Sequence, residues 1–226
     1  KIKKSKLVTL ILFLISFNGY TQTTHGSDHA NVRPTQTQLD SILKLNITPV
    51  IEADRFGHLV IQDTDGRMKP INTYASELLR KLSKKDVYQT FDANQVFLSM
   101  QESPQLWYNV PLIYLKAKKA DTIRTLLGLN KTAKYAALVD FLSPNLDYKL
   151  GPYLEDAYSA QVPTAIQKIF KETDQRVSLL FNTLEGSALR LYPIPDDENN
   201  TWVSSKGFRE GGYVLKDSLY GNFIKT

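Results

Sequence analysis

The chain of 226 residues contains no cysteine. This absence excludes disulfide bonds, thiol catalysis, zinc sites built on cysteine and covalent c-type haem attachment to the chain itself. Histidine is also scarce, because His25, His29 and His58 are the only three in the sequence. His25 and His29 stand four apart beside Gly26 and Ser27, which disfavour a helix, so we interpret them as part of a polar tail.

A long apolar run is missing as well. Residues 7–17, LVTLILFLISF, are strongly apolar, but eleven residues are fewer than the roughly 20 that a membrane-spanning helix needs. Four lysines precede this run and a polar stretch rich in Thr and Gln follows it, which is typical of a secretory signal peptide. We therefore expect residues 1–22 to be a signal peptide or membrane anchor and residues 23–34 a flexible linker. A buried core helix is the remaining alternative for the apolar run.

The net charge of +5 carries little information about partners. Four of the 28 lysines and arginines lie in the first six residues, and without them the chain is close to neutral. The sequence thus gives no indication of nucleic-acid binding. We expect residues 35–226 to form one exported, mainly helical domain that is cut at its C-terminal end.

Hydrophobic spacing predicts the elements of this domain. Helices are expected at residues 35–45, from a cap at Thr73 to Leu82, at 94–101, 121–129 and 131–142, and most clearly at 164–184. Residues 106–116 are expected to be extended, and residues 189–204 to form an extended piece, a turn and an acidic loop. The fold class is therefore mainly α with a small β-hairpin near residues 59–71.

The hairpin carries the most distinctive stretch of the sequence, DTDGRMKPINTYASELLRK, at residues 63–81. Asp63 to Gly66 have the residue types of a tight turn between strand 59–62 and a return strand 67–71. Arg67 and Lys69 alternate along that return strand. We expect them either to contact haem propionates or a protein partner, or to be structural cations in solvent or in ion pairs.

Motifs for catalysis are absent from the sequence. The DTDG stretch lacks the further ligands of a calcium loop, and Gly66 stands alone where a phosphate loop needs several glycines. A Ser–His–Asp triad would have to use His58, but the sequence contains no G-x-S-x-G nucleophile elbow. Asp196, Asp197 and Glu198 could be the paired carboxylates of a glycosidase, but they have the composition of a solvated turn. Trp107 and Tyr108, with Tyr114, are candidates to line an apolar ligand or a haem face, with a place in the core as the alternative. No catalytic or metal residue is therefore assigned.

Several segments in order carry a family resemblance: GRMKPINTYASELLRK, NQVFLSM, PQLWYNVPLIYLK, AKYAALVDF, YKLGPYLEDAY and LYPIPDDENNTWVS. They resemble the soluble region of the large cytochrome c biogenesis proteins of Bacteroidetes-type bacteria, which are similar to fused ResB–CcsA (CcsBA-type, system II) synthases. The resemblance covers roughly residues 35–205. It implies a module on the periplasmic side of the inner membrane, with apocytochrome c and membrane-embedded haem-handling segments as partners.

The chain also departs from that family. The multi-span membrane portion and the tryptophan-rich segment are absent, and no haem-ligand histidine of the family matches His25, His29 or His58. Haem is thus implied for the full-length family and not by any residue of this chain. We expect the module to act as a scaffold or partner-binding surface, while haem attachment belongs to the membrane parts. A free-standing exported module that binds a small ligand or peptide is the alternative.

Overall fold

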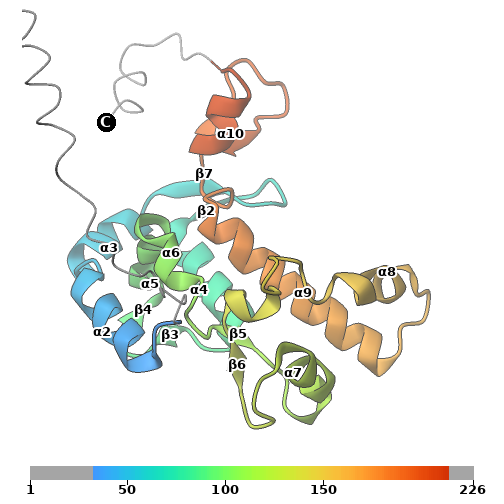
Figure 1. Cartoon of the computed structure of the whole chain (residues 1–226). Helices are drawn as coiled ribbons and strands as arrows, with labels where there is room; N and C mark the ends of the chain where they lie inside the picture. The colour runs from blue at the N-terminus through green and yellow to red at the C-terminus, as the bar shows by residue number, and fades with distance from the viewer. Residues whose placement is uncertain (1–32, 214–226) are drawn as a thin grey trace, which may run out of the picture. The chain divides into compact units, whose positions relative to one another are not determined.

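The computed structural model describes residues 33–213 of the chain (Figure 1). The predicted signal peptide or anchor at residues 1–22 lies outside the described residues, as do most of the predicted linker, His25 and His29. The domain boundaries therefore stay predictions.

The fold is mainly helical with small antiparallel strand pairs, as the sequence predicted. The α-helices within residues 33–213 are α2 (Gln36–Asn46), α3 (Val50–Gly57), α4 (Ile71–Ser83), α5 (Ala93–Glu102), α6 (Pro104–Trp107), α7 (Asp121–Leu127), α8 (Gly151–Ser159), α9 (Ala165–Leu184) and α10 (Ser205–Glu210). The strand pairs are β1 (Val60–Gln62) with β2 (Met68–Pro70), β3 (Val87–Tyr88) with β4 (Phe91–Asp92), β5 (Ile113–Tyr114) with β6 (Tyr135–Ala136), and β7 (Arg190–Pro193) with β8 (Trp202–Ser204). Two short 3-10 helices are η1 (Lys118–Ala120) and η2 (Leu138–Phe141).

The predicted hairpin is present, with Ile61 of β1 opposite Lys69 of β2. The expected helix cap at Thr73 is wrong, because α4 already begins at Ile71 and Pro70 occupies the N-cap position. Proline lacks a backbone N–H and holds φ near −65°, so it suits the residue just before a helix, where no intrahelical donor is needed. The strand and the helix are therefore joined without a loop.

The first helix begins where the sequence indicates, because Thr35 and Gln38 form a reciprocal capping box at the start of α2. Pro49 follows the end of α2 and stands at the N-cap of a further helix, α3. The sequence analysis missed α3. Its first two residues, Val50 and Ile51, are exposed, so its apolar pattern does not mark the buried face.

A continuous hydrophobic core joins α4 and α5 to the long helix α9. The apolar face predicted for α4 is buried, at Ala75, Leu78, Leu79 and Leu82. This agreement follows from the spacing of three and four residues, which places these side chains on one side of the helix.

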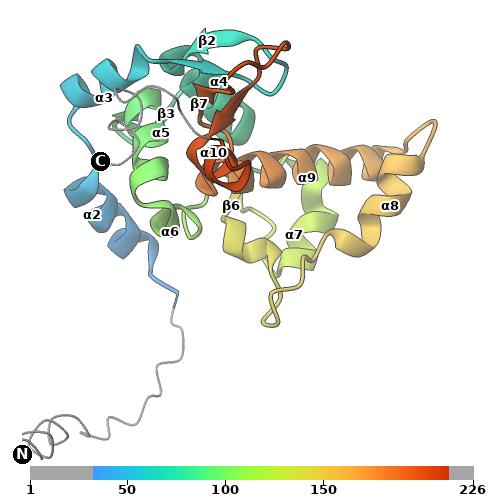
Figure 2. The ribbon, with the colours of Figure 1, turned by 90° about the horizontal axis from the view of Figure 1, so that it is seen from above.

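Helix α9 was predicted at residues 164–184 and is found at Ala165–Leu184, after a Thr164 cap. Most of its apolar stripe is buried, but Ile166 and Phe181 are exposed at 59% and 47%. Figure 2 shows α8 lying alongside the N-terminal part of α9. The Asp174 carboxylate of α9 accepts hydrogen bonds from the hydroxyls of Tyr148 (2.9 Å) and Tyr158 (2.8 Å), which attaches the α8 region to this helix.

The helix predicted at residues 131–142 is wrong. The segment forms a turn, strand β6 and the 3-10 helix η2. The Asn130 side chain accepts the backbone N–H of Thr132 (2.9 Å), which favours a turn, and Tyr135 then pairs with Tyr114 of β5. The extended structure predicted at residues 106–116 is found only in part, because α6 ends at Trp107 and β5 covers two residues.

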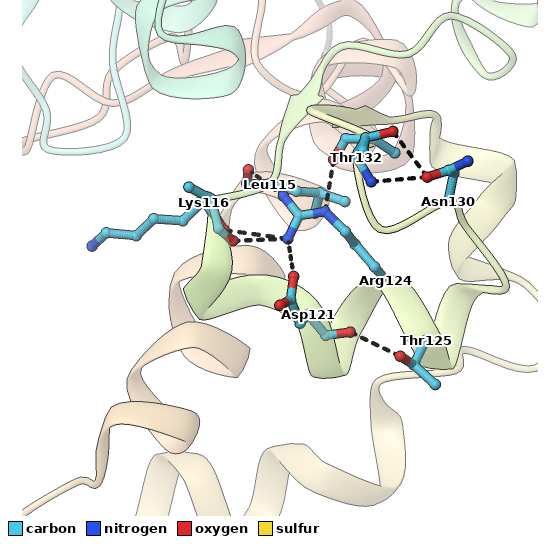
Figure 3. Close-up of polar contacts among 9 residues, drawn as sticks. Leu115, Lys116, Asp121, Arg124, Thr125, Asn130 and Thr132 are labelled. Atoms are coloured by element: carbon cyan, nitrogen blue, oxygen red, sulfur yellow. Dashed lines mark hydrogen bonds and ion pairs between the residues drawn. The ribbon is translucent and has the colours of Figure 1, made fainter.

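A buried arginine fixes the loops around this strand pair. Only 3% of Arg124, on α7, is exposed. Figure 3 shows its guanidinium in a ring of acceptors. The acceptors are the carbonyls of Leu115 (2.9 Å), Ala117 (2.8 Å) and Ala133 (2.7 Å), and the Asp121 carboxylate (3.0 Å). One side chain thus connects the segment after β5 to the segment before β6.

We expect Arg124→Met to lower the free energy of unfolding by about 3 kcal/mol or more, because buried carbonyls would lose their donors. Urea denaturation followed by circular dichroism measures this. Lys119→Met, an exposed change beside the same loop, serves as the control and should stay within about 0.5 kcal/mol of the wild type. Equal stability of the two variants would contradict the role given to Arg124.

Candidate functional site

The predicted basic corner is organised by the buried carboxylate of Asp63, which is 6% exposed. One carboxylate oxygen accepts the backbone N–H groups of Asp65 and Arg67, both at 2.9 Å. Gly66 completes the turn with a φ of +80°, a conformation that residues with a Cβ rarely adopt. The Asp and Gly residues of the sequence motif therefore form a turn that is stabilised by contacts within the protein.

Lys69 lies between two carboxylates. Its ammonium is 2.9 Å from Asp63 and 3.0 Å from Glu77 of α4, and its side chain is 19% exposed. The hydrogen bond from Lys69 lowers the pKa of Asp63, and the hydrogen bonds to Asp63 and Glu77 raise the pKa of Lys69. The lysine charge is therefore balanced within the protein.

Arg67 has a different environment from Lys69, although both belong to the predicted basic corner. Arg67 is exposed, and its side chain makes no ion pair with any residue in the described range 33–213. It remains a predicted partner contact, while the geometry gives no support to a ligand role for Lys69.

The corner also connects to the C-terminal strand pair. The Gln62 side-chain amide donates to the carbonyl of Asn200 (3.0 Å), and its oxygen accepts the N–H of Trp202 (2.7 Å). Arg190 approaches the Asp63 carbonyl at 3.4 Å. These contacts link residues more than 120 positions apart, so local sequence patterns gave no signal for them.

Trp107 and Tyr108 are neighbours in the chain with different surroundings. Trp107 is fully buried, and its indole N–H donates to the Ser99 hydroxyl at 3.0 Å. The ring of Tyr88 packs edge-on against it, with centroids 5.5 Å apart. Both the apolar surface and the donor of Trp107 are thus occupied within the protein, which leaves no face of this indole for a ligand.

Tyr108 borders an open, apolar pocket of about 290 Å³. Its hydroxyl donates to the Glu185 carboxylate at 2.7 Å, and burial together with that carboxylate raises the pKa of Tyr108 to about 12. The hydroxyl therefore stays a donor at neutral pH. The other lining residues are Leu138, Phe141, Leu142, Tyr148, Val177, Ser178 and Phe181. Sequence reasoning found only Tyr108, since the other residues come from η2, the segment that follows it and α9.

Of the residues predicted to contact a ligand, Lys69 and Trp107 are occupied by contacts within the protein. Lys69 is already paired twice, and Trp107 is enclosed in the core. His58 is the histidine within residues 33–213, and its Nδ1 lies 2.8 Å from the Asp54 carbonyl on the exposed end of α3. Within the same range, no group of three or more acidic or histidine side chains is arranged to hold a metal ion. None of the helices described there is both long and apolar enough for a bilayer span.

We expect Lys69→Ala to lower the free energy of unfolding by about 1–3 kcal/mol, because the buried Asp63 would lose its cation. Arg67→Ala, two positions away and exposed, should change it by about 0.5 kcal/mol or less. Urea denaturation of both variants tests this. If Lys69→Ala is as stable as Arg67→Ala, the lysine is not a structural cation.

The pH dependence of stability follows from Asp63. Its pKa is lowered in the fold, so its contribution is fully present above the unfolded value of about 3.9 and is lost as the pH falls through the folded pKa. The pKa of Lys69 is raised in the fold, so its contribution to stability has the opposite pH dependence. It is lost as the pH rises through that pKa. We expect Asp63→Asn to lose less stability than the wild type between pH 5 and pH 2.

Unfolding free energies measured across that acid range test this expectation. Lys69→Met is the matched variant, because it removes the largest cause of the lowered Asp63 pKa and should flatten the curve as well. An acid loss as steep in Asp63→Asn as in the wild type would show that Asp63 makes no such contribution.

Comparison with known proteins adds one relationship. No known family model matches the chain. Protein NrfI of Wolinella succinogenes is 34% identical to it over 154 residues, which are 67% of this chain and 16% of the relative. The chain therefore spans about one sixth of the length of that relative, and it is distantly homologous to one part of NrfI.

Proposed function

We propose that residues 35–226 form an extracytoplasmic module of a system II cytochrome c maturation protein, and that the module acts as a partner-binding surface. The observation that carries this proposal is the 34% identity to NrfI over 154 residues. The segments that resemble cytochrome c biogenesis proteins lie within residues 35–205, and this resemblance supports the proposal. The NrfI alignment covers only part of the relative, which is consistent with one module of a larger protein.

A binding role suits the described side chains better than a catalytic one. The most distinctive charged groups, Asp63, Lys69 and Glu77, neutralise one another inside the protein. The carboxylate of Asp174 is likewise bonded to two tyrosine hydroxyls. Such groups stabilise a rigid scaffold. On this proposal, haem attachment depends on membrane parts that lie outside residues 33–213.

The apolar pocket beside Tyr108 is the surface that we propose for the partner. Apolar pockets with an aromatic rim bind protruding side chains of protein partners, and most of the binding energy of an interface comes from such contacts. Phe181 is 47% exposed at this pocket, although most of the apolar stripe of α9 is buried. The occupant we propose is an apolar side chain of an extended apocytochrome c segment.

We expect Phe181→Ser, made in the full-length protein of the source bacterium, to lower the yield of holocytochrome c several-fold through loss of this contact. Haem-stained gels measure the yield, and immunoblots check that the protein itself is present at the wild-type level. Ile166→Ser is the matched control, because Ile166 is exposed on the same helix and does not line the pocket.

Three outcomes distinguish the proposed surface, the maturation role and the alternative of a free-standing binding module. A loss of holocytochrome confined to Phe181→Ser supports the proposed surface. Wild-type yields from both variants contradict this surface while leaving the family role in place. A normal yield after complete deletion of the protein contradicts the maturation role and favours a free-standing exported binding module.

A further inference from the structure

A second cavity has a more polar lining than the pocket beside Tyr108. It is a cleft of about 540 Å³ between the ends of β5 and β6, η1 and the turn at residues 130–133. Its lining includes Tyr114, Tyr135, Lys118, Lys131, Lys134 and the guanidinium-bearing Arg124. Figure 3 shows Arg124 at the centre of this region, held by the surrounding loops. The volume lies within the range of pockets that bind small molecules.

The segment around the cleft is strongly cationic. Residues 116–134 contain six lysines and arginines and one carboxylate, Asp121, although the chain from residue 33 to residue 213 is almost neutral. Asp121 pairs with Arg124 (3.0 Å), and Lys116 pairs with Glu172 (3.6 Å). Lys118, Lys131 and Lys134 are exposed and make no ion pair with a described residue. Their positive charge is therefore not balanced by an ion pair within residues 33–213, and it borders the cleft.

The cleft is also lined by two aromatic rings. The rings of Tyr114 and Tyr135 are half-buried and meet edge-on, with centroids 6.0 Å apart. The Lys85 ammonium lies 5.8 Å from the centroid of the Tyr135 ring, which adds a further cation near the cleft. Arg124 fixes the loops on both sides, so the lysines and tyrosines are held around a preformed space.

We propose that this cleft binds a small anionic ligand that carries a phosphate or carboxylate group on a planar, apolar body. Lysine ammonium groups attract such anions as point charges, and the tyrosine rings pack against the planar part. A hollow lined by exposed lysines suits a discrete ligand better than it suits a flat membrane surface. The site shares no lining residue with the pocket of Tyr108 and Phe181, and the proposal does not depend on the maturation role.

The test is a titration of the ¹⁵N-labelled 226-residue chain with 1-naphthyl phosphate, followed by amide chemical shifts in nuclear magnetic resonance spectra. Three further probes separate the parts of the ligand: 1-naphthoate carries a carboxylate on the same ring, 1-naphthol carries no phosphate or carboxylate group, and inorganic phosphate has no ring. We expect saturable shifts at residues 114–118 and 131–135 with both naphthyl anions. Inorganic phosphate should bind more weakly at the same amides, and 1-naphthol weakest.

The double variant Lys131→Gln/Lys134→Gln should weaken the binding of 1-naphthyl phosphate about tenfold or more, because two charge-assisted contacts are lost. The matched control is Lys44→Gln/Lys81→Gln, which removes the same charge from exposed positions on α2 and α4 and should stay within about twofold of the wild type. Unchanged amide spectra outside the cleft show that each variant is folded.

The results that would overturn the proposal are equally specific. Saturable binding at other amides, or none at all, removes the site. Equal losses in the two double variants would mean that net charge alone attracts the probe. Equal affinity for 1-naphthol and 1-naphthyl phosphate would show that the anion is not recognised.

Discussion

The buried carboxylate of Asp63 is the contact on which the arrangement of the hairpin corner depends. It closes the turn through two backbone N–H groups, and it balances the charge of Lys69, which reaches Glu77 on α4. The neighbouring Gln62 attaches the same corner to the β7–β8 pair. A charge held in this way stabilises a junction between segments. The most distinctive motif in the sequence is therefore explained largely by structure.

The surfaces left for binding lie elsewhere and differ in chemistry. The pocket beside Tyr108 is apolar and lies against the exposed Phe181 of α9. The cleft around Arg124 is cationic and lies between β5 and β6. Arg124 and Asp174 have comparable structural roles, because each satisfies several groups from separate segments with one buried side chain. A scaffold with two proposed binding surfaces is consistent with the proposed module, which would hold partners together.

Much of the fold could be predicted from local patterns. The spacing of Leu78, Leu79 and Leu82 indicated α4, the apolar stripe of residues 166–184 indicated α9, and Asp63–Gly66 indicated the hairpin turn. The helix expected at residues 131–142 was wrong because pairing of Tyr135 with Tyr114 outweighed local helix propensity. The candidate site was less predictable, since Phe181 lines the pocket together with residues some 40 positions away. Proximity of that kind comes from packing, and no spacing rule in the sequence encodes it.

Hydrogen–deuterium exchange of the 226-residue chain with a synthetic apocytochrome c segment that contains Cys-x-x-Cys-His tests the central claim most directly. The claim is that the apolar pocket binds the partner while the Asp63 corner supports the scaffold. The account predicts added protection at residues 138–142 and 177–181 and unchanged exchange at residues 63–69. Protection at residues 63–69 without a change at the pocket, or no protection at any residue, would contradict it.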